Sequence, residues 1–223
     1  MNFLLLAFIL TFFLSISSFQ SHAAEPAPTR TLRVVALGDS LTAGYGLQAT
    51  EAFPAKLEAA LRSEGLNVSV ENAGVSGDTT AGGLARLDQS IAGATKPDLV
   101  IVELGANDIL RGGSPVEMEN NLRQILTRLQ QQHIPILLAG MNAPIYMPGP
   151  FRSQYNKIFP KLADEFDVPL YEFFLDGVAL NPKYNLEDRM HPNALGVYII
   201  VQKIKSSVQN ILIPKKGFFG FFQ

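Results

Sequence analysis

Five short apolar runs recur along the chain, separated by longer stretches in which apolar residues return every third or fourth position. The runs are rich in Val, Ile and Leu and lack strict alternation of apolar and polar residues. That pattern is typical of strands buried on both faces of a sheet. Strands are therefore expected over residues 33–38, 67–72, 98–105, 134–142 and 168–174.

The separating stretches predict helices, because a spacing of three or four residues lines up apolar side chains on one helical face. Helices are expected over residues 53–65, 115–132, 153–166 and 193–212. The first ends at Gly65, which suits a left-handed C-cap. The third contains Pro160, where we expect the helix to bend or restart.

Strands that alternate with helices favour right-handed crossovers and a parallel sheet covered on both faces. The pattern predicts an α/β fold, namely a three-layer α/β/α sandwich with a five-stranded parallel sheet of flavodoxin-like topology. No internal repeat or low-complexity linker interrupts the alternation. Residues 25–213 are accordingly expected to form a single domain.

The first 24 residues are set apart from this fold. The segment is apolar from Phe3 to Ile16 and then reaches small residues up to Ala24, which indicates a secretory signal cleaved after Ala23 or Ala24. A periplasmic or secreted protein is expected. The alternative is an uncleaved membrane anchor, because no Lys or Arg precedes the apolar run and a helix over residues 1–18 would be about 27 Å long.

The last ten residues, 214–223, form a separate tail in which Lys215 and Lys216 precede four phenylalanines. One interpretation is a poorly ordered end. The other is a weak contact with a membrane interface through basic and aromatic side chains.

Charge and cysteine content narrow the other classes of partner. The formal net charge is −2, which gives no sign of a nucleic-acid partner. The chain has no cysteine, so neither disulfides nor thiolate metal sites hold the fold, and a thioether-linked lipid anchor is excluded. Stability is expected to come from the core, and nothing in the sequence indicates an oligomeric state.

Polar residues with glycines follow three of the predicted strands. Asp39 and Ser40 follow the first strand, Gly77 the second and Asn107 the third. In an open parallel sheet ligands bind at the carboxyl ends of the strands, so these loops are expected to meet at one edge.

A serine at such an edge needs a base to remove its proton before it becomes a good nucleophile. The chain has three histidines. His22 lies in the predicted signal and His133 precedes the fourth strand, at the opposite edge, which leaves His191 after the fifth. Asp188 is three residues earlier and can hold the imidazole with Nε2 toward Ser40, as in a catalytic triad.

An oxyanion that forms at Ser40 would also need hydrogen-bond donors. The backbone N–H groups of Ser40 and Gly77 and the side-chain amide of Asn107 are candidates, and Asp39 is expected to bond the loops around Ser40. Each residue also has a structural alternative. Ser40 or Asp188 can cap a helix, His191 can be a surface residue and Asn107 can end a strand.

Apolar residues near this edge can line a groove for an acyl chain or an aryl group, or can be ordinary packing; they are Leu110, Ile145, Tyr146, Met147 and Phe151. The candidate substrate contacts are Asp108, Ile109, Leu110, Ile145 and Tyr146.

The blocks "GDSLTAGYG", "NAGVSGDTTAGGLARL", "VIVELGANDILRG" and "DRMHPN" resemble the SGNH (GDSL) hydrolase family, most of all its exported acyl-CoA thioesterase I, lysophospholipase and arylesterase branch. The resemblance runs from about Leu32 into the last predicted helix. It implies Ser40, Asp188 and His191 as triad, and Ser40, Gly77 and Asn107 as oxyanion hole. It also implies a loop from Asp108 to Pro115 that moves on substrate binding. The chain departs from the pattern in its aromatic tail and in Met190, beside the histidine.

The predicted function is that of an exported serine esterase acting on acyl or aryl esters, and on acyl thioesters or lysophospholipids, through an acyl-enzyme and without a metal or cofactor. A carbohydrate acetylesterase or acyltransferase on the same scaffold is one alternative. A non-catalytic acyl-chain or lipid carrier is another. A flavodoxin-like nucleotide binder is disfavoured because no phosphate-binding loop follows the first strand.

Overall fold

The computed structural model describes residues 30–213. The predicted signal of residues 1–24 and the tail of residues 214–223 lie outside the described residues. Within residues 30–213, no helix has the length and apolar character needed to cross a membrane.

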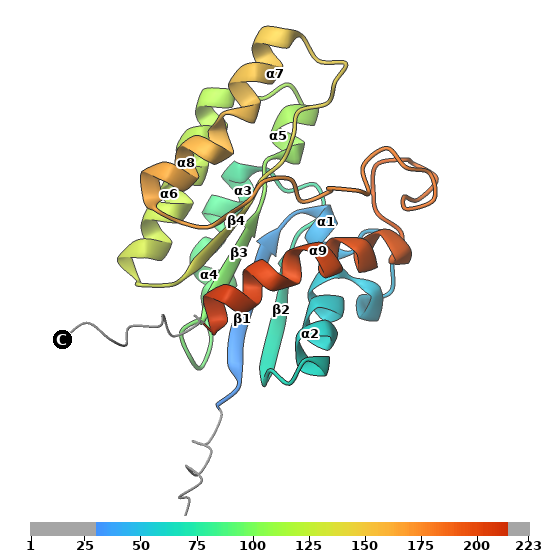
Figure 1. Ribbon diagram of the computed structural model, residues 1–223. Helices are drawn as coiled ribbons and strands as arrows, with labels where there is room; N and C mark the ends of the chain where they lie inside the picture. Colours follow the sequence, from blue (N-terminus) through green and yellow to red (C-terminus); the bar gives the residue numbers. More distant parts are fainter. Residues whose placement is uncertain (1–29, 214–223) are drawn as a thin grey trace, which may run out of the picture.

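A five-stranded parallel sheet forms the middle of the molecule, in the order β2-β1-β3-β4-β5 (Figure 1). Its strands are β1 (Leu32–Gly38), β2 (Val68–Gly74), β3 (Leu99–Glu103), β4 (Ile136–Ala139) and β5 (Leu170–Tyr171). The strand order reverses between β1 and β3, because β1 leads to β2 on one side while the chain continues through β3 on the other. The predicted α/β fold with a five-stranded parallel sheet is confirmed.

Burial separates the inner strands from the edge strands. β3 and β4 are buried along their whole length, and β1 is buried except at its first residue. β2 and β5 are partly exposed, because each has a neighbouring strand on one side only. The expectation of strands buried on both faces therefore holds for three of the five.

β5 is shorter than the expected strand over residues 168–174. It pairs with β4 through two residues, and the chain then turns so that the Phe174 N–H donates to the Gly140 carbonyl at 2.8 Å.

Helices cover the sheet in two layers (Figure 1). α2 packs against α9, and α6 packs against both α3 and α8. The helical elements are α1 (Ser40–Ala43), the 3₁₀ turn η1 (Ala49–Glu51), α2 (Phe53–Ser63), α3 (Thr80–Ala85), α4 (Leu87–Ile91), α5 (Ala106–Leu110), α6 (Pro115–Gln131), α7 (Gly149–Asn156), α8 (Ile158–Phe166) and α9 (Ala194–Leu212).

The predicted restart at Pro160 is wrong in position. The helix breaks at Lys157, which separates α7 from α8. Pro160 is the third residue of α8, within the first turn, where a missing backbone N–H costs no intrahelical hydrogen bond. The proline therefore fits the start of α8 rather than creating the break.

The two ends of the described chain lie at the amino-terminal edge of the sheet (Figure 1). β1 starts there, and α9 runs back to that edge from the loop that contains His191. Near its end, Lys205 and Gln209 bond Glu64, the C-cap of α2.

Candidate active site

Ser40 is the first residue of α1, and a single residue, Asp39, separates it from the end of β1. Asp39 caps this helix, because its Oδ1 accepts a hydrogen bond from the Leu41 N–H at 3.0 Å. The cap fixes the turn and brings the Ser40 side chain to the carboxyl edge of the sheet, where the strand order reverses. This is the position at which parallel α/β sheets bind ligands.

His191 and Asp188 come from the loop between β5 and α9. Asp188 Oδ1 accepts from the backbone N–H groups of Met190 and His191 at 2.9 and 3.0 Å, which closes a tight turn. Its Oδ2 lies 2.6 Å from His191 Nδ1, and His191 Nε2 lies 2.9 Å from Ser40 Oγ. Ser40, His191 and Asp188 thus form one hydrogen-bonded line, although 151 residues separate the first two.

The charge on Asp188 decides how the imidazole is protonated. Partial burial alone would raise the pKa of Asp188, but hydrogen bonds from the His191 and Met190 N–H groups and from the imidazole outweigh it and lower the pKa to about 2. Asp188 is then an acceptor over the working pH range, so Nδ1 carries the proton and Nε2 is free to accept the Ser40 hydroxyl. This is the tautomer that a general base requires.

Gly77 lies in the loop after β2, and Asn107 lies in α5, just beyond β3. Within residues 30–213 the N–H groups of Ser40 and Gly77 donate to no protein acceptor. The Asn107 amide instead uses both of its hydrogens, donating to Asp39 Oδ2 at 3.0 Å and to the Asp78 carbonyl at 2.9 Å. Donation from Asn107 to an oxyanion would require one of these bonds to be shared or released.

A second carboxyl group, that of Glu103 at the end of β3, lies against the turn that carries Ser40. It is fully buried, and its Oε2 accepts from the Thr42 hydroxyl at 2.7 Å and from the Asp39 N–H at 3.4 Å. Burial raises the pKa of both Asp39 and Glu103. Sequence reasoning missed Glu103, although a single charged residue in the apolar run "LVIVELG" was a usable signal.

The five candidate substrate contacts divide into two groups. Asp108 and Ile109 are buried, and the Asp108 carboxylate accepts from the Thr80 N–H at 2.9 Å and from the Thr80 hydroxyl at 2.6 Å. Leu110, the last residue of α5, is exposed, as are Ile145 and Tyr146 in the loop that follows β4. The geometry gives Asp108 a structural role and leaves the three exposed side chains as candidates for a substrate groove.

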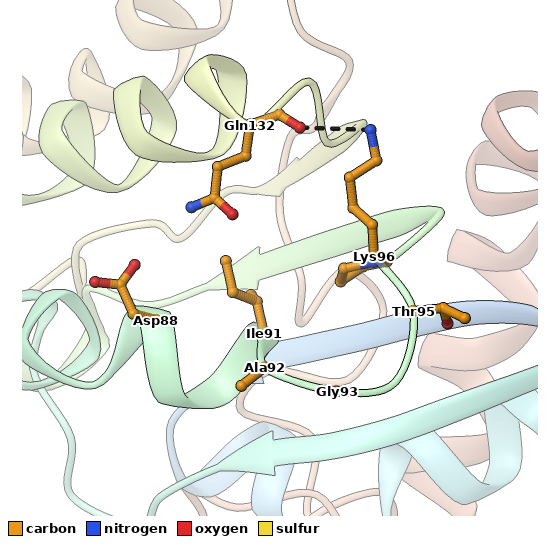
Figure 2. A pocket seen from close by; sticks show the side chains of 8 residues that line it. Asp88, Ile91, Ala92, Gly93, Thr95, Lys96 and Gln132 are labelled. Atoms are coloured by element: carbon orange, nitrogen blue, oxygen red, sulfur yellow. Dashed lines mark hydrogen bonds between the residues drawn. The ribbon is translucent and has the colours of Figure 1, made fainter.

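His133 precedes β4 and lies at the other edge of the sheet, as its place in the sequence implies. A surface pocket of about 350 Å³ lies at that edge, between the end of α4, the loop leading to β3 and the end of α6 (Figure 2). Lys96 borders it and donates to the carbonyls of Gln132 and His133 at 3.4 and 3.0 Å. This pocket does not include Ser40 or His191 and is not the candidate active site.

Comparison with known proteins gives a consistent result. Residues 36–198 match the model of the GDSL-like Lipase/Acylhydrolase family. The chain is 41% identical over 181 residues to thioesterase 1/protease 1/lysophospholipase L1 of Escherichia coli K12, covering 81% of this chain and 82% of that protein. It is 37% identical over 188 residues to an arylesterase of Vibrio mimicus, covering 84% and 88%. The crystal structure of AlinE4, an SGNH-hydrolase family esterase, superposes with a TM-score of 0.70 at 47% identity, covering 82% of this chain and 98% of that one.

Proposed function

Because the chain belongs to the GDSL-like Lipase/Acylhydrolase family and is an ester-hydrolysing enzyme, we propose that Ser40, His191 and Asp188 carry out the reaction as a catalytic triad. The observation that carries this proposal is the hydrogen-bonded line from Ser40 Oγ through the imidazole to Asp188, with distances of 2.9 and 2.6 Å. These distances are within the reach needed for proton transfer in a nucleophile and base pair.

In the first half of the reaction, Ser40 Oγ attacks the ester carbonyl carbon while its proton passes to His191 Nε2. The tetrahedral intermediate then collapses, the bond to the leaving oxygen breaks, and Nε2 returns the proton to that oxygen. An acyl-enzyme on Ser40 remains. Asp188 holds the imidazole and stabilises it while it is charged.

In the second half, water takes the place of the alcohol. His191 Nε2 removes a proton from the water, the resulting oxygen attacks the acyl carbon, and the proton returns to Ser40 Oγ as the acid leaves. The same imidazole donates a proton to the leaving group in the first half and removes one from water in the second, so one residue serves both halves.

The oxyanion of each intermediate would be held by the N–H groups of Ser40 and Gly77 and by the Asn107 amide. The N–H groups of Ser40 and Gly77, which donate to no acceptor among the described residues, support this assignment, because preorganised donors need no rearrangement when charge develops. We expect Asn107→Ala to lower kcat by about 10²- to 10³-fold with a small change in KM. Asn120→Ala, an exposed residue of α6, is the matched control, and equal kcat values for the two variants would reject the role of Asn107.

We further propose carboxylic acyl or aryl esters as substrates, extending to acyl thioesters and lysophospholipids. Ile145 and Tyr146 support this, because they are 80% and 76% exposed beside the carboxyl edge of the sheet, where an apolar chain could cover them. The names of the relatives, thioesterase 1/protease 1/lysophospholipase L1 of Escherichia coli and arylesterase of Vibrio mimicus, agree with this range.

The N-terminal segment of residues 1–24 supports a periplasmic or secreted location. Comparing the mass of the purified mature protein with that expected after cleavage at Ala23 or Ala24 would test this proposal directly, and an uncleaved chain would favour the anchor.

The central experiment is hydrolysis of p-nitrophenyl esters from acetate to palmitate, and of matched thioesters, by wild type and Ser40→Ala. We expect Ser40→Ala to lose nearly all activity and wild-type Ser40 to be labelled by a fluorophosphonate. Full activity in Ser40→Ala would overturn the mechanism, and no labelling with no turnover would favour a non-catalytic carrier. Product analysis with sugar or alcohol acceptors would reveal an acyltransferase.

The chain-length profile tests the groove separately. Ile145→Ser is expected to shift the preference toward shorter acyl chains, whereas Ile213→Ser, exposed at the end of α9, is the control. A sharp wild-type maximum at acetate would reject the groove.

A further inference from the structure

The aromatic ring of Tyr45 covers one face of the His191 imidazole. The two ring centroids are 4.4 Å apart, and the ring planes are tilted by 35°. Tyr45 lies in the turn after α1, whereas His191 lies in the loop before α9, so the contact joins two parts of the chain that are distant in sequence. Tyr45 is 51% exposed, and burial in the core does not account for its position.

The turn that carries Tyr45 is fixed to the backbone of Ser40. The N–H groups of Gly44 and Tyr45 both donate to the Ser40 carbonyl at 3.1 Å. Gly44 and Gly46 on either side have φ values of +83° and +74°, which glycine adopts without strain. The turn therefore reverses directly after the nucleophile helix and directs the ring back over the active-site edge.

The same turn packs against the loop that holds the base. A Cβ added at Gly46 would lie 2.7 Å from Leu186 Cδ1, so the backbone at Gly46 packs against the Leu186 side chain of that loop. Leu186 is hydrogen-bonded to the backbone of His191, since its N–H donates to the His191 carbonyl at 2.8 Å. Tyr45 thus joins the loop of Ser40 to the loop of His191.

The hydrogen bonds of His191 fix the edge of its imidazole but not its face, which the Tyr45 ring contacts. Asp188 bonds Nδ1 and Ser40 bonds Nε2, and both bonds lie at the edge of the imidazole. Edge bonds resist sliding of the ring more than tilting of its plane. An aromatic ring against the face opposes tilting and also favours the positively charged imidazole through its π electrons.

We propose that Tyr45 is a positioning residue for the general base, acting through the face of its ring on the orientation and charge of His191. The inference rests on the proposed triad. The hydroxyl of Tyr45 has no part in it, so the effect is expected to survive in a phenylalanine. The contact acts in both halves of the reaction, because His191 is charged whenever a tetrahedral intermediate is present.

The kinetic experiment compares Tyr45→Phe and Tyr45→Leu with wild type. Tyr45→Leu is expected to lower kcat by about 3- to 10-fold with KM nearly unchanged, in line with the strength of an aromatic pair, whereas Tyr45→Phe stays within twofold of wild type. Tyr198→Leu is the matched control, because Tyr198 is 55% exposed on α9 and has no ring contact with His191.

The pH profile distinguishes positioning from a loss of packing. Within residues 30–213, the Asp188 carboxylate bonds the edge of the His191 imidazole and Asp39 interacts with its charge, and neither carboxyl group is altered by the substitution. Without the ring, the charged imidazole is less stable, so the acid limb of kcat/KM in Tyr45→Leu should move about half a pH unit lower. A merely structural role would lower stability and leave this limb in place.

Nuclear magnetic resonance of the histidine side chains gives a readout without substrate. The Tyr45 ring should shift the carbon-bound protons of His191, and Tyr45→Leu and Tyr45→Met should both abolish the shift. His133, at the other edge of the sheet, is an internal reference that should not change. Because Tyr45→Met is a second ringless variant, the test does not depend on the folding of one protein.

Two results would overturn the inference while Ser40→Ala remained inactive. One is a Tyr45→Leu enzyme with wild-type kcat and an unmoved acid limb. The other is a loss in Tyr45→Phe as large as in Tyr45→Leu. Full activity in Ser40→Ala would instead contradict the proposed triad on which the inference rests.

Discussion

Glu103 shows how one carboxyl group can constrain the turn that carries Ser40. Its Oε1 has no hydrogen-bond partner among the described residues, and its Oε2 is an acceptor for Thr42 and Asp39. A buried charge without a compensating partner is costly. Burial first, and the neighbouring charge of Asp39 second, raise the pKa of Glu103 well above its ordinary value. We infer that Glu103 is neutral and that Asp39, which holds the Asn107 amide, has the single negative charge of the pair.

This charge state predicts how stability depends on pH. Because the native pKa of Glu103 is raised, the native protein keeps a proton that the unfolded chain releases above about pH 4.3. Below that pH, Glu103 is protonated in both states and does not lower the free energy of unfolding. As the pH rises from there toward the native pKa of Glu103, the free energy of unfolding falls. Glu103→Gln, a neutral residue of the same shape, should match wild type at pH 4 and exceed it by about 1 kcal/mol or more at pH 8.

Urea unfolding of both proteins at the two pH values measures the difference. A Glu103→Gln protein that is less stable than wild type at both values would mean that the carboxylate itself is needed. We expect the kcat of Glu103→Gln at neutral pH to remain near wild type, because the side-chain oxygen of the introduced glutamine still accepts the hydrogen bond from the Thr42 hydroxyl.

Residues whose chemistry is local could be predicted from the sequence, and residues that depend on a tertiary contact could not. Of three histidines, His191 alone follows a strand, and Asp188 stands at a spacing that a turn can close. The contact of Tyr45 with His191 depends on two glycines with positive φ, which the sequence pattern does not reveal. The buried position of Asp108 was likewise hidden, because its partner Thr80 is 28 residues away.

At the scale of elements, the long helices could be predicted and the short ones could not. α2, α6 and α9 carry an apolar face that repeats over several turns. α3 and α5 have six and five residues, too few for a period to be visible, and are joined by hydrogen bonds from Thr80 to Asp108. These hydrogen bonds join helices that follow different strands, so the local sequence does not predict them.

Asp108 is the main link between α3 and α5. It accepts two hydrogen bonds from Thr80, the first residue of α3, and Asn121 of α6 donates to the Thr80 hydroxyl at 3.1 Å. Asp108→Ala leaves the buried donors of Thr80 without a partner and should reduce the free energy of unfolding by about 2 to 4 kcal/mol. Because Asn107 precedes Asp108, kcat should fall as well.

Thermal and denaturant unfolding measure this loss. Asp88→Ala, which removes an exposed carboxylate on α4, is the matched control and should stay within about 0.5 kcal/mol of wild type. Equal stability of the two variants would show that α3 is held by packing alone.

At the scale of the whole molecule, stability depends on the middle of the sheet. Ile101 is fully buried in β3, with Ala36 of β1 and Leu137 of β4 as its register partners. Ile101→Ala leaves a cavity between two helix layers and should cost about 2 to 5 kcal/mol. Val116→Ala, at an exposed position of α6, should cost little.

Unfolding followed by circular dichroism and by tyrosine fluorescence tests whether the molecule responds as one unit. Coincident transitions in Ile101→Ala are expected for a single cooperative core. Separate transitions would mean that the two sides of the sheet unfold independently.

The fold class followed from the alternation of strands and helices, because that alternation restricts the connections to a parallel sheet with covered faces. The edge strands departed from the expectation, since hydrophobic pattern alone does not say which strand has one neighbour. β5 is also shorter than expected, because its pairing with β4 stops after Tyr171 and the hydrophobic pattern does not show where pairing ends.

Both ends of the described chain leave the molecule at the sheet edge opposite Ser40 and His191. A resin, a display scaffold or a fused carrier joined at either of these ends would therefore lie on the side opposite Ser40 and His191 and leave that edge accessible to substrate. Attachment chemistry can thus be chosen for convenience, because the fold already orients the edge that carries Ser40 and His191 away from the support.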